Sequence, residues 1–219
     1  MTISKNYPPI RVHGIFGYDR GAKARWLLTE LDIPYSDRWM STEVREFEQP
    51  EYLAKLNPMG RVPVVEIGDT VMFESNAIAA YLADNFGIGR MAPALDSWDR
   101  ASYQKWMYFA AASIDVLQTR IMVIEDIPAG EVATAKWKAL LEDTRDVMVG
   151  LDSVLAKNEY LVANQFSAAD ICVGYHLYWL TLWPEFLAII GEFPKIGAYL
   201  ERMKKRPAAI KAGVFTFEE

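Results

Sequence analysis

Residues 60–78 read GRVPVVEIGDTVMFESNAI, and this stretch decides most of the fold. Two apolar runs, 62–67 and 71–73, flank the pair Gly68-Asp69, which suits the two-residue turn of a β-hairpin. Directly after the hairpin, the apolar spacing over 74–85 is typical of a helix. We therefore expect two antiparallel strands followed by a helix.

Strand-like and helix-like patterns alternate upstream of this stretch. The first three expected elements are a strand, a helix and a second strand, over residues 10–13, 23–31 and 35–39. A second helix is expected from about residue 41 to residue 56, because Ser41 and Thr42 can cap it and the turn sequence NPMG at 57–60 ends it. The predicted order is βαβ followed by αββα.

Downstream the pattern changes, and no strand is predicted. Residues 88–97 are irregular and are interpreted as a linker. The helical patterns that follow cover about 98–125, 131–157, 167–182 and 195–205. We expect an α/β domain over residues 8–87, the linker, and an all-helical domain over residues 98–219.

Composition limits the classes of protein that the chain can belong to. With 219 residues, 52% of them hydrophobic, and a formal net charge of −6, the chain is long and apolar enough for a large core. Acidic charge without a basic block argues against a nucleic-acid partner. The longest run without a charged residue, 171–184, is shorter than the ~20 residues of a membrane span. The first residues lack a signal-peptide core, so a cytoplasmic location is expected.

Cysteine and histidine are scarce. The single cysteine, Cys172, excludes an internal disulfide and a CxxC redox pair, and two histidines leave little for a metal. Cys172 and His176 lie four residues apart on a predicted helix, but two such residues do not make a metal site. We expect no metal.

Pro63 lies at the start of a predicted strand, where it cannot donate to the ladder. The Val62–Pro63 bond can be trans, as most such bonds are, or cis. A cis bond would turn the backbone N–H and C=O of Val62 outward, ready to pair with an extended peptide-like ligand. Spacing alone does not decide between these alternatives.

Glu74 and Ser75 stand where the predicted helix begins. Ser75 is a good N-cap, and a helix N-terminus offers free N–H groups and a positive dipole end. Such a corner binds a carboxylate, while Glu74 can pair with an ammonium, so together they suit an amino-acid head group. The alternative is that Ser75 only caps the helix and Glu74 is solvated.

The sequence FSAADI at 166–171 predicts a folding motif. Ser167 as N-cap and Asp170 three residues later can form a capping box, and Phe166 and Ile171 occupy the hydrophobic-staple positions. The helix that follows is apolar nearly all round, so we expect it to form the buried centre of its domain.

The order of elements and these three motifs resemble the glutathione transferase superfamily of soluble, cytosolic type, over nearly the whole chain. The resemblance implies a thioredoxin-like N-terminal domain (βαβαββα) and an all-α C-terminal domain. It also implies a cis bond before Pro63, with Val62 pairing with the cysteinyl part of glutathione as co-substrate. The resemblance implies Glu74 and Ser75 for the γ-glutamyl end of glutathione. It implies Arg61 and Trp39 for the glycyl end.

The sequence departs from the family at the catalytic position. Members that it resembles carry a Tyr at the end of the first strand, or a Ser or Cys at the start of the first helix. Here the strand-end position falls on Gly14, and the Ser/Cys position falls on Tyr18 or on Asp19. Tyr18 is the candidate hydroxyl, with Arg20 as support for the thiolate, whereas a carboxylate of Asp19 facing the sulfur would oppose ionisation. The alternative is that Tyr18 only packs in its loop.

The resemblance also suggests a second-substrate pocket. The predicted helix that begins near residue 98 borders the cleft in members of the family, and one of its faces carries Tyr103, Trp106, Met107 and Ala110. Aromatic and Met side chains suit a small apolar electrophile. The alternative is that this face belongs to the core.

Two classes of function follow from the resemblance. The first is an enzyme of detoxification that joins glutathione to an apolar electrophile, or uses it to reduce peroxides. The second is a related binding or scaffold protein without catalysis. A homodimer is expected in both, and the sequence identifies neither the electrophile nor the class within the superfamily.

Overall fold

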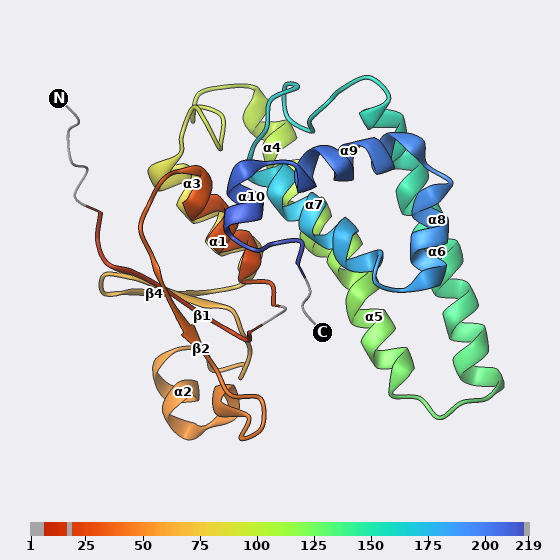
Figure 1. The fold of residues 1–219 in the computed structure, drawn as a ribbon, viewed down its shortest axis with the longest axis horizontal. Coiled ribbons are helices and arrows are strands. Elements are labelled where there is room, and N and C mark those ends of the chain that lie inside the picture. The colour runs from red at the N-terminus through yellow and green to blue at the C-terminus, as the bar shows by residue number, and fades with distance from the viewer. Residues whose placement is uncertain (1–6, 17–18, 217–219) are drawn as a thin grey trace. The chain divides into compact units, whose positions relative to one another are not determined.

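The structure, a computed structural model, describes residues 7–16 and 19–216 (Figure 1). The chain forms two compact units. The first comprises the described residues up to Gly87 together with those from Pro207 onward, and the second runs from Ile88 to Arg206. The candidate site described below lies in the first unit.

The first unit is built on a four-stranded sheet in the order β2-β1-β3-β4. The strands are β1 (Ile10–Gly14), β2 (Ser36–Trp39), β3 (Val64–Ile67) and β4 (Thr70–Phe73). β1 runs parallel to β2 and antiparallel to β3, and β3 and β4 form the predicted hairpin. This mixed sheet has the expected thioredoxin-like topology.

Three helices cover the sheet: α1 (Ala22–Glu30), α2 (Pro50–Lys55) and α3 (Ser75–Phe86). α1 and α3 pack together on one face, and α2 lies on the other (Figure 1). Val64 and Val65 of β3 are fully buried, because successive side chains of a strand point to opposite faces and both faces are covered.

The predicted second helix, 41–56, is wrong in its first half. The helix α2 begins only at Pro50, after a short 3-10 turn over Glu46–Glu48. Proline fits the first turn of a helix but not its interior, and Arg45 has a left-handed backbone with φ 46°. The Glu46 side chain accepts a hydrogen bond from the Ser41 amide at 3.1 Å instead of capping a helix.

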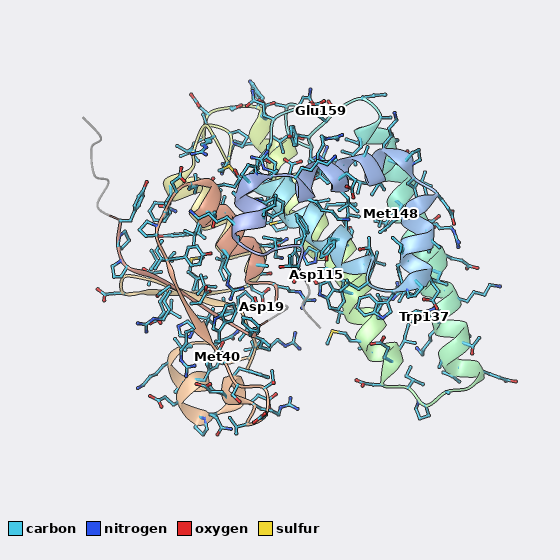
Figure 2. The ribbon with its side chains drawn as sticks, viewed as in Figure 1. Asp19, Met40, Asp115, Trp137, Met148 and Glu159 are labelled. Atoms are coloured by element: carbon cyan, nitrogen blue, oxygen red, sulfur yellow. The ribbon has the colours of Figure 1, made fainter. Side chains whose placement is uncertain are left out.

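The regular elements of the second unit are helices. They are α4 (Asp99–Phe109), a π-helical segment (Ala110–Ile114), α5 (Asp115–Glu125), α6 (Glu131–Leu155), α7 (Ala168–Leu180), α8 (Pro184–Gly191) and α9 (Pro194–Lys204). The apolar helix α7 packs against α4, α5 and α9 and is buried along almost its whole length, as expected. Trp137 of α6, labelled in Figure 2, has its ring 5.5 Å from that of Phe186 of α8, in an edge-to-face arrangement.

One continuous helical stretch, Asp99–Glu125, meets the length and hydropathy of a membrane span. Core helices of globular proteins meet the same criterion, and both α4 and α5 pack against α7. The length and hydropathy of this stretch are therefore weak evidence for a membrane-spanning helix.

Ser167 and Asp170 form a capping box at the start of α7. The Ser167 amide donates to Asp170 Oδ2 at 2.9 Å, and the Leu161 amide donates to Oδ1 at 3.0 Å. The Tyr199 hydroxyl of α9 also donates to Oδ1, at 3.1 Å. Asp170 thus joins the loop before α7, the helix itself and α9.

The C-terminal helix α10 (Pro207–Lys211), which the sequence patterns did not predict, packs against α1. Just beyond it, the ring of Phe215 meets Trp26 at 5.3 Å. Contacts therefore group the chain from Pro207 with the first unit, whereas the predicted helical domain ran to residue 219. The predicted linker, 88–97, stays a prediction.

Candidate functional site

Three segments meet at one end of the sheet: the Val62–Pro63 turn before β3, the start of α3 after β4, and the start of α1 after β1. The Val62–Pro63 bond is cis. A Cβ atom placed on Gly21 would lie 3.2 Å from the Cβ of Pro63. The start of α1 therefore lies directly against the proline.

Two side chains fix the turn that leads to Pro63. The Tyr52 hydroxyl and the Asn57 side-chain amide both donate to the Arg61 carbonyl, at 2.8 and 2.9 Å. The Asn57 oxygen accepts from the Met59 amide at 2.9 Å. Sequence analysis missed this role of Tyr52 and Asn57, although the turn signal NPMG already marked the segment. The Arg61 side chain itself is exposed.

The backbone of Val62 is open to a ligand. In the part of the chain that the structure describes, neither its N–H nor its C=O hydrogen bonds to the protein. An unpaired backbone donor and acceptor side by side can pair with an extended peptide as an added strand does.

The start of α3 combines several features that favour an anion. Neither the amide nor the hydroxyl of Ser75 hydrogen bonds to another described residue, and the side chain is nearly buried at 8% exposure. Lys23 of α1 is fully buried, and its ammonium donates to Asn76 Oδ1 at 2.5 Å. The positive end of the helix dipole favours an anion at Ser75, and the Lys23 ammonium is held at the neighbouring Asn76 side chain. The prediction that Ser75 is the N-cap is wrong, because Glu74, exposed and with φ 67°, holds the N-cap position and Ser75 is the first helical residue.

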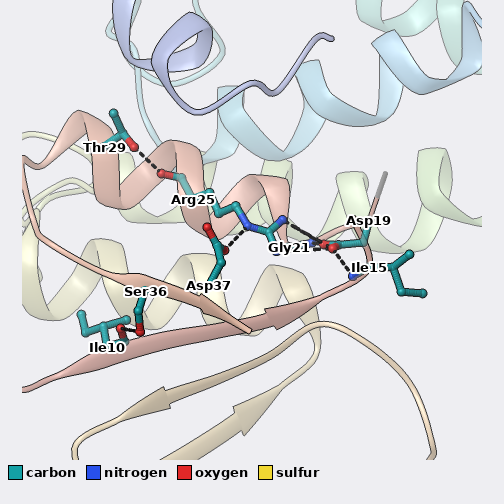
Figure 3. A network of polar contacts seen from close by, with 8 residues as sticks. All are labelled: Ile10, Ile15, Asp19, Gly21, Arg25, Thr29, Ser36 and Asp37. Atoms are coloured by element: carbon teal, nitrogen blue, oxygen red, sulfur yellow. Dashed lines mark hydrogen bonds and ion pairs between the residues drawn. The ribbon is translucent and has the colours of Figure 1, made fainter. Parts of the chain in front are cut away.

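The loop between β1 and α1 is organised by Asp19 (Figure 3). Its carboxylate is almost fully buried, and it accepts hydrogen bonds from the Ile15 amide at 2.7 Å and from the Gly21 amide. Arg25 of α1 lies 3.3–3.4 Å from the same two oxygens. Burial raises the pKa of the Asp19 carboxyl, whereas Arg25 and the two amides oppose that rise. Tyr18, the candidate hydroxyl, lies outside the described residues.

Arg25 extends the network to β2. Its Nε donates to Asp37 Oδ1 at 2.6 Å, and its guanidinium lies 4.2 Å above the ring of Trp39. Trp39 in turn meets the edge of Phe16 at 5.4 Å and keeps 38% of its surface exposed. Sequence analysis missed Arg25, and the available signal was a second basic residue, two positions after Lys23, beside the apolar run Trp26-Leu27-Leu28.

The network accounts for glycine at the strand end. A Cβ atom on Gly14 would overlap the Asp19 carboxylate and the Arg25 guanidinium. A tyrosine at this position is therefore incompatible with the ion pair. Arg20, the expected support for the thiolate, is half-buried.

The four residues predicted to line a second-substrate pocket lie together in the second unit. Tyr103, Trp106, Met107 and Ala110 are buried on α4 and at the start of the π-helical segment. Their role in binding stays a prediction. Among residues 7–16 and 19–216, no group of three or more His, Cys, Asp or Glu side chains could hold a metal ion.

Comparison with known proteins places this geometry in a family. Residues 8–84 match the model "Glutathione S-transferase, N-terminal domain", and residues 135–202 match "Glutathione S-transferase, C-terminal domain". Glutathione S-transferase F14 of Arabidopsis thaliana is 30% identical over 197 residues, which cover 84% of this chain and 74% of that protein. Elongation factor 1-gamma of Prunus avium is 32% identical over 167 residues, which cover 72% of this chain but 37% of that protein.

A solved structure is similar over nearly the full length. The theta class glutathione S-transferase of Xanthomonas axonopodis pv. citri, with glutathione bound, is 27% identical with a TM-score of 0.78. The match covers 95% of this chain and 98% of that one. The fold, the two matched domain models and the relatives agree, and the chain belongs to the glutathione S-transferase superfamily.

Proposed function

We propose that this protein binds glutathione at the corner formed by Val62, Pro63 and the start of α3. The observation that carries the proposal is the unpaired backbone of Val62 beside the open N-terminus of α3. Val62 would pair with the cysteinyl part, and the Ser75 hydroxyl and amide would hold the γ-glutamyl carboxylate, with Glu74 on its ammonium. Arg61 and Trp39, both exposed, would face the glycyl end.

The proposed reaction is attack of the glutathione sulfur on an apolar electrophile. The thiol loses its proton to solvent, and the thiolate forms the new carbon–sulfur bond while the leaving group departs. Stabilising the thiolate requires positive potential, which the amino end of α1 and Arg20 would supply. The hydroxyl of Tyr18 would donate to the sulfur. The electrophile would bind near Tyr103, Trp106, Met107 and Ala110, and a peroxide is the alternative second substrate.

A non-catalytic binding protein is the second candidate. A specific observation favours it, because the positions of the usual thiol-activating residues are not filled by them. Gly14 occupies the strand end, and no Ser or Cys lies between Ile10 and Thr29. The relative from Prunus avium is named as an elongation factor and not as a transferase. A homodimer and a cytoplasmic location are part of both proposals.

The two candidates separate in a pair of assays on the full chain. Retention on immobilised glutathione tests the binding site, and conjugation of glutathione to an aryl halide tests catalysis. Retention with turnover that falls in Tyr18→Phe supports the transferase, whereas retention without turnover up to about pH 8 favours the binding protein. Failure of the wild-type protein to bind glutathione would overturn both candidates.

A further inference from the structure

We propose that the Asp19–Arg25 pair is a positioning device for the glutathione thiolate. The pair holds the start of α1 against the Val62–Pro63 turn, so that the helix presents its amino end to the sulfur, and it does so without touching glutathione. This inference rests on the proposed function, because it assumes that the thiol binds at this corner.

The first step is that Asp19 holds both sides of its loop. One oxygen accepts the Ile15 amide, directly after β1, and the other accepts the Gly21 amide, directly before α1. A single carboxylate therefore sets the distance between the strand end and the helix start. An asparagine could accept only one of these two amides, since its other terminal atom is a donor.

The second step is that Arg25 anchors Asp19 to the rest of the unit. The guanidinium lies between Asp37 and Asp19 (Figure 3), with the Trp39 ring 4.2 Å away. It also compensates the charge of Asp19. Without Arg25, a buried carboxylate beside the helix start would disfavour a thiolate nearby.

The third step is that the pair lies close to the turn at Pro63. Gly21, held by Asp19, has its Cβ position filled by the Asp19 carboxylate on one side and Pro63 on the other. Burial, and next the charge of Asp19, raise the pKa of Tyr52, whose hydroxyl holds the Arg61 carbonyl. The position of Gly21 between Asp19 and Pro63 shows that the carboxylate lies beside the binding turn.

The consequence concerns the orientation of α1. The amides in the first turn of a helix stabilise an anion only when they point at it, and small displacements remove most of the effect. Gly21 is the residue immediately before that turn. Releasing it from Asp19 should weaken thiolate stabilisation while leaving Val62, Glu74 and Ser75 in place.

The test measures the pKa of the bound glutathione thiol from the ultraviolet absorbance of the thiolate, which needs no turnover. The variants are Asp19→Asn, Arg25→Lys and Gly14→Ala, which break the pair from three sides. Arg25→Lys and Gly14→Ala are each expected to raise the bound thiol's pKa by about 1 unit, because they displace the helix start and keep the carboxylate. Asp19→Asn also removes a negative charge beside the sulfur, so its rise is expected to be smaller. Where turnover is present, kcat should fall about ten-fold at a pH below that pKa, with KM for glutathione within about two-fold of wild type.

The control variant is Arg145→Gln, which breaks an exposed arginine–carboxylate pair with Glu192 in the second unit. It should leave the thiol pKa unchanged. Thermal unfolding identifies any variant that fails to fold, and Arg25→Lys, which keeps the buried charge, is the mildest of the three. The double variant Gly14→Ala/Asp19→Asn should raise the pKa no further than Gly14→Ala alone, because both substitutions break the same contact.

The outcomes separate the inference from the function beneath it. A wild-type protein that does not bind glutathione refutes the proposed function. A wild-type protein that binds it, with folded Gly14→Ala and Arg25→Lys variants whose bound thiol has the wild-type pKa, overturns the positioning role alone.

Discussion

Asp19 and Asp170 are both buried, and each of their oxygens accepts one backbone amide, yet the remaining donors differ. Asp19 completes its contacts with the guanidinium of Arg25. Asp170 completes them with neutral hydroxyls, those of Ser167 and Tyr199. The carboxylate of Asp19 thus faces a cation beside the candidate site, where Arg25 opposes the rise in its pKa that burial causes. A carboxylate bonded only by neutral donors is suited to fixing a helix start.

The same arrangement thus serves two purposes. In the second unit it joins three segments of a core around α7. In the first unit it joins a strand, a loop and a helix beside an open binding corner. The comparison predicts that a substitution at Asp170 mainly lowers the free energy of unfolding. A substitution at Asp19 should mainly change the pKa of the bound glutathione thiol.

The largest expected effect is on stability in Asp170→Asn. The amide side chain cannot accept both the Leu161 and Ser167 N–H groups, so one buried donor loses its partner. We expect the free energy of unfolding at pH 7, measured by urea denaturation, to fall by about 3 kcal/mol. The pKa of the bound glutathione thiol should not change. Asp152→Asn is the matched control, because both amides that Asp152 accepts, those of Lys195 and Ile196, meet one oxygen. Equal losses in the two variants would contradict the account.

A pH series sharpens the same comparison. Burial raises the pKa of Asp170 to about 6. The folded protein therefore binds more protons than the unfolded chain between about pH 4 and pH 6, so this contribution to stability is full below that window and is lost as the pH rises through it. The free energy of unfolding of the wild type, relative to that of Asp170→Asn, should therefore be about 2 kcal/mol higher at pH 4 than at pH 7. A difference that grows with pH would mean that the hydrogen bonds outweigh burial.

Asp19→Asn should cost less stability than Asp170→Asn. Arg25 keeps its 2.6 Å bond to Asp37, so no buried charge is left without a partner. We expect the free energy of unfolding, measured by urea denaturation, to fall by about 1–2 kcal/mol. The pKa of the bound glutathione thiol should change as described above. If Asp19→Asn instead unfolds most of the protein, and the folded remainder binds glutathione with the wild-type thiol pKa, the contrast between the two aspartates fails.

The smallest expected effect is that of Tyr52→Phe. The Arg61 carbonyl loses the Tyr52 hydroxyl but keeps the Asn57 side-chain amide at 2.9 Å. We expect less than about 1 kcal/mol of destabilisation and glutathione affinity within about two-fold of wild type. Calorimetry and thermal unfolding measure both. A large loss of affinity would place Tyr52, rather than the Asp19–Arg25 pair, in control of the turn.

Local patterns in the sequence were sufficient for the fold. The hairpin, the order of elements around it and the capping box at Ser167 and Asp170 each depend on neighbouring residues, which periodicity and capping rules describe. The start of α2 was missed because Pro50 and the left-handed Arg45 outweigh the caps at Ser41 and Thr42. Short helices such as α8 and α10 leave too few turns for a clear period.

The candidate site could be predicted only in part. Val62, Pro63, Glu74 and Ser75 lie within one stretch, so the sequence places them together. The Asp19–Arg25–Asp37 network joins a loop, a helix and a strand, and two of its side chains, Asp19 and Arg25, are buried against expectation for their type. No spacing rule predicts such a network, and only the three-dimensional structure explains why Gly14 has no side chain.

The central claim is that glutathione binds at the start of α3, and calorimetric titration of glutathione into wild type and Ser75→Ala tests it most directly. The account predicts saturable binding by the wild type, about ten-fold weaker binding by Ser75→Ala after loss of a hydrogen bond to a carboxylate, and wild-type binding by Ser153→Ala, an exposed serine on α6. No binding by the wild type, or equal affinity in Ser75→Ala, would contradict it.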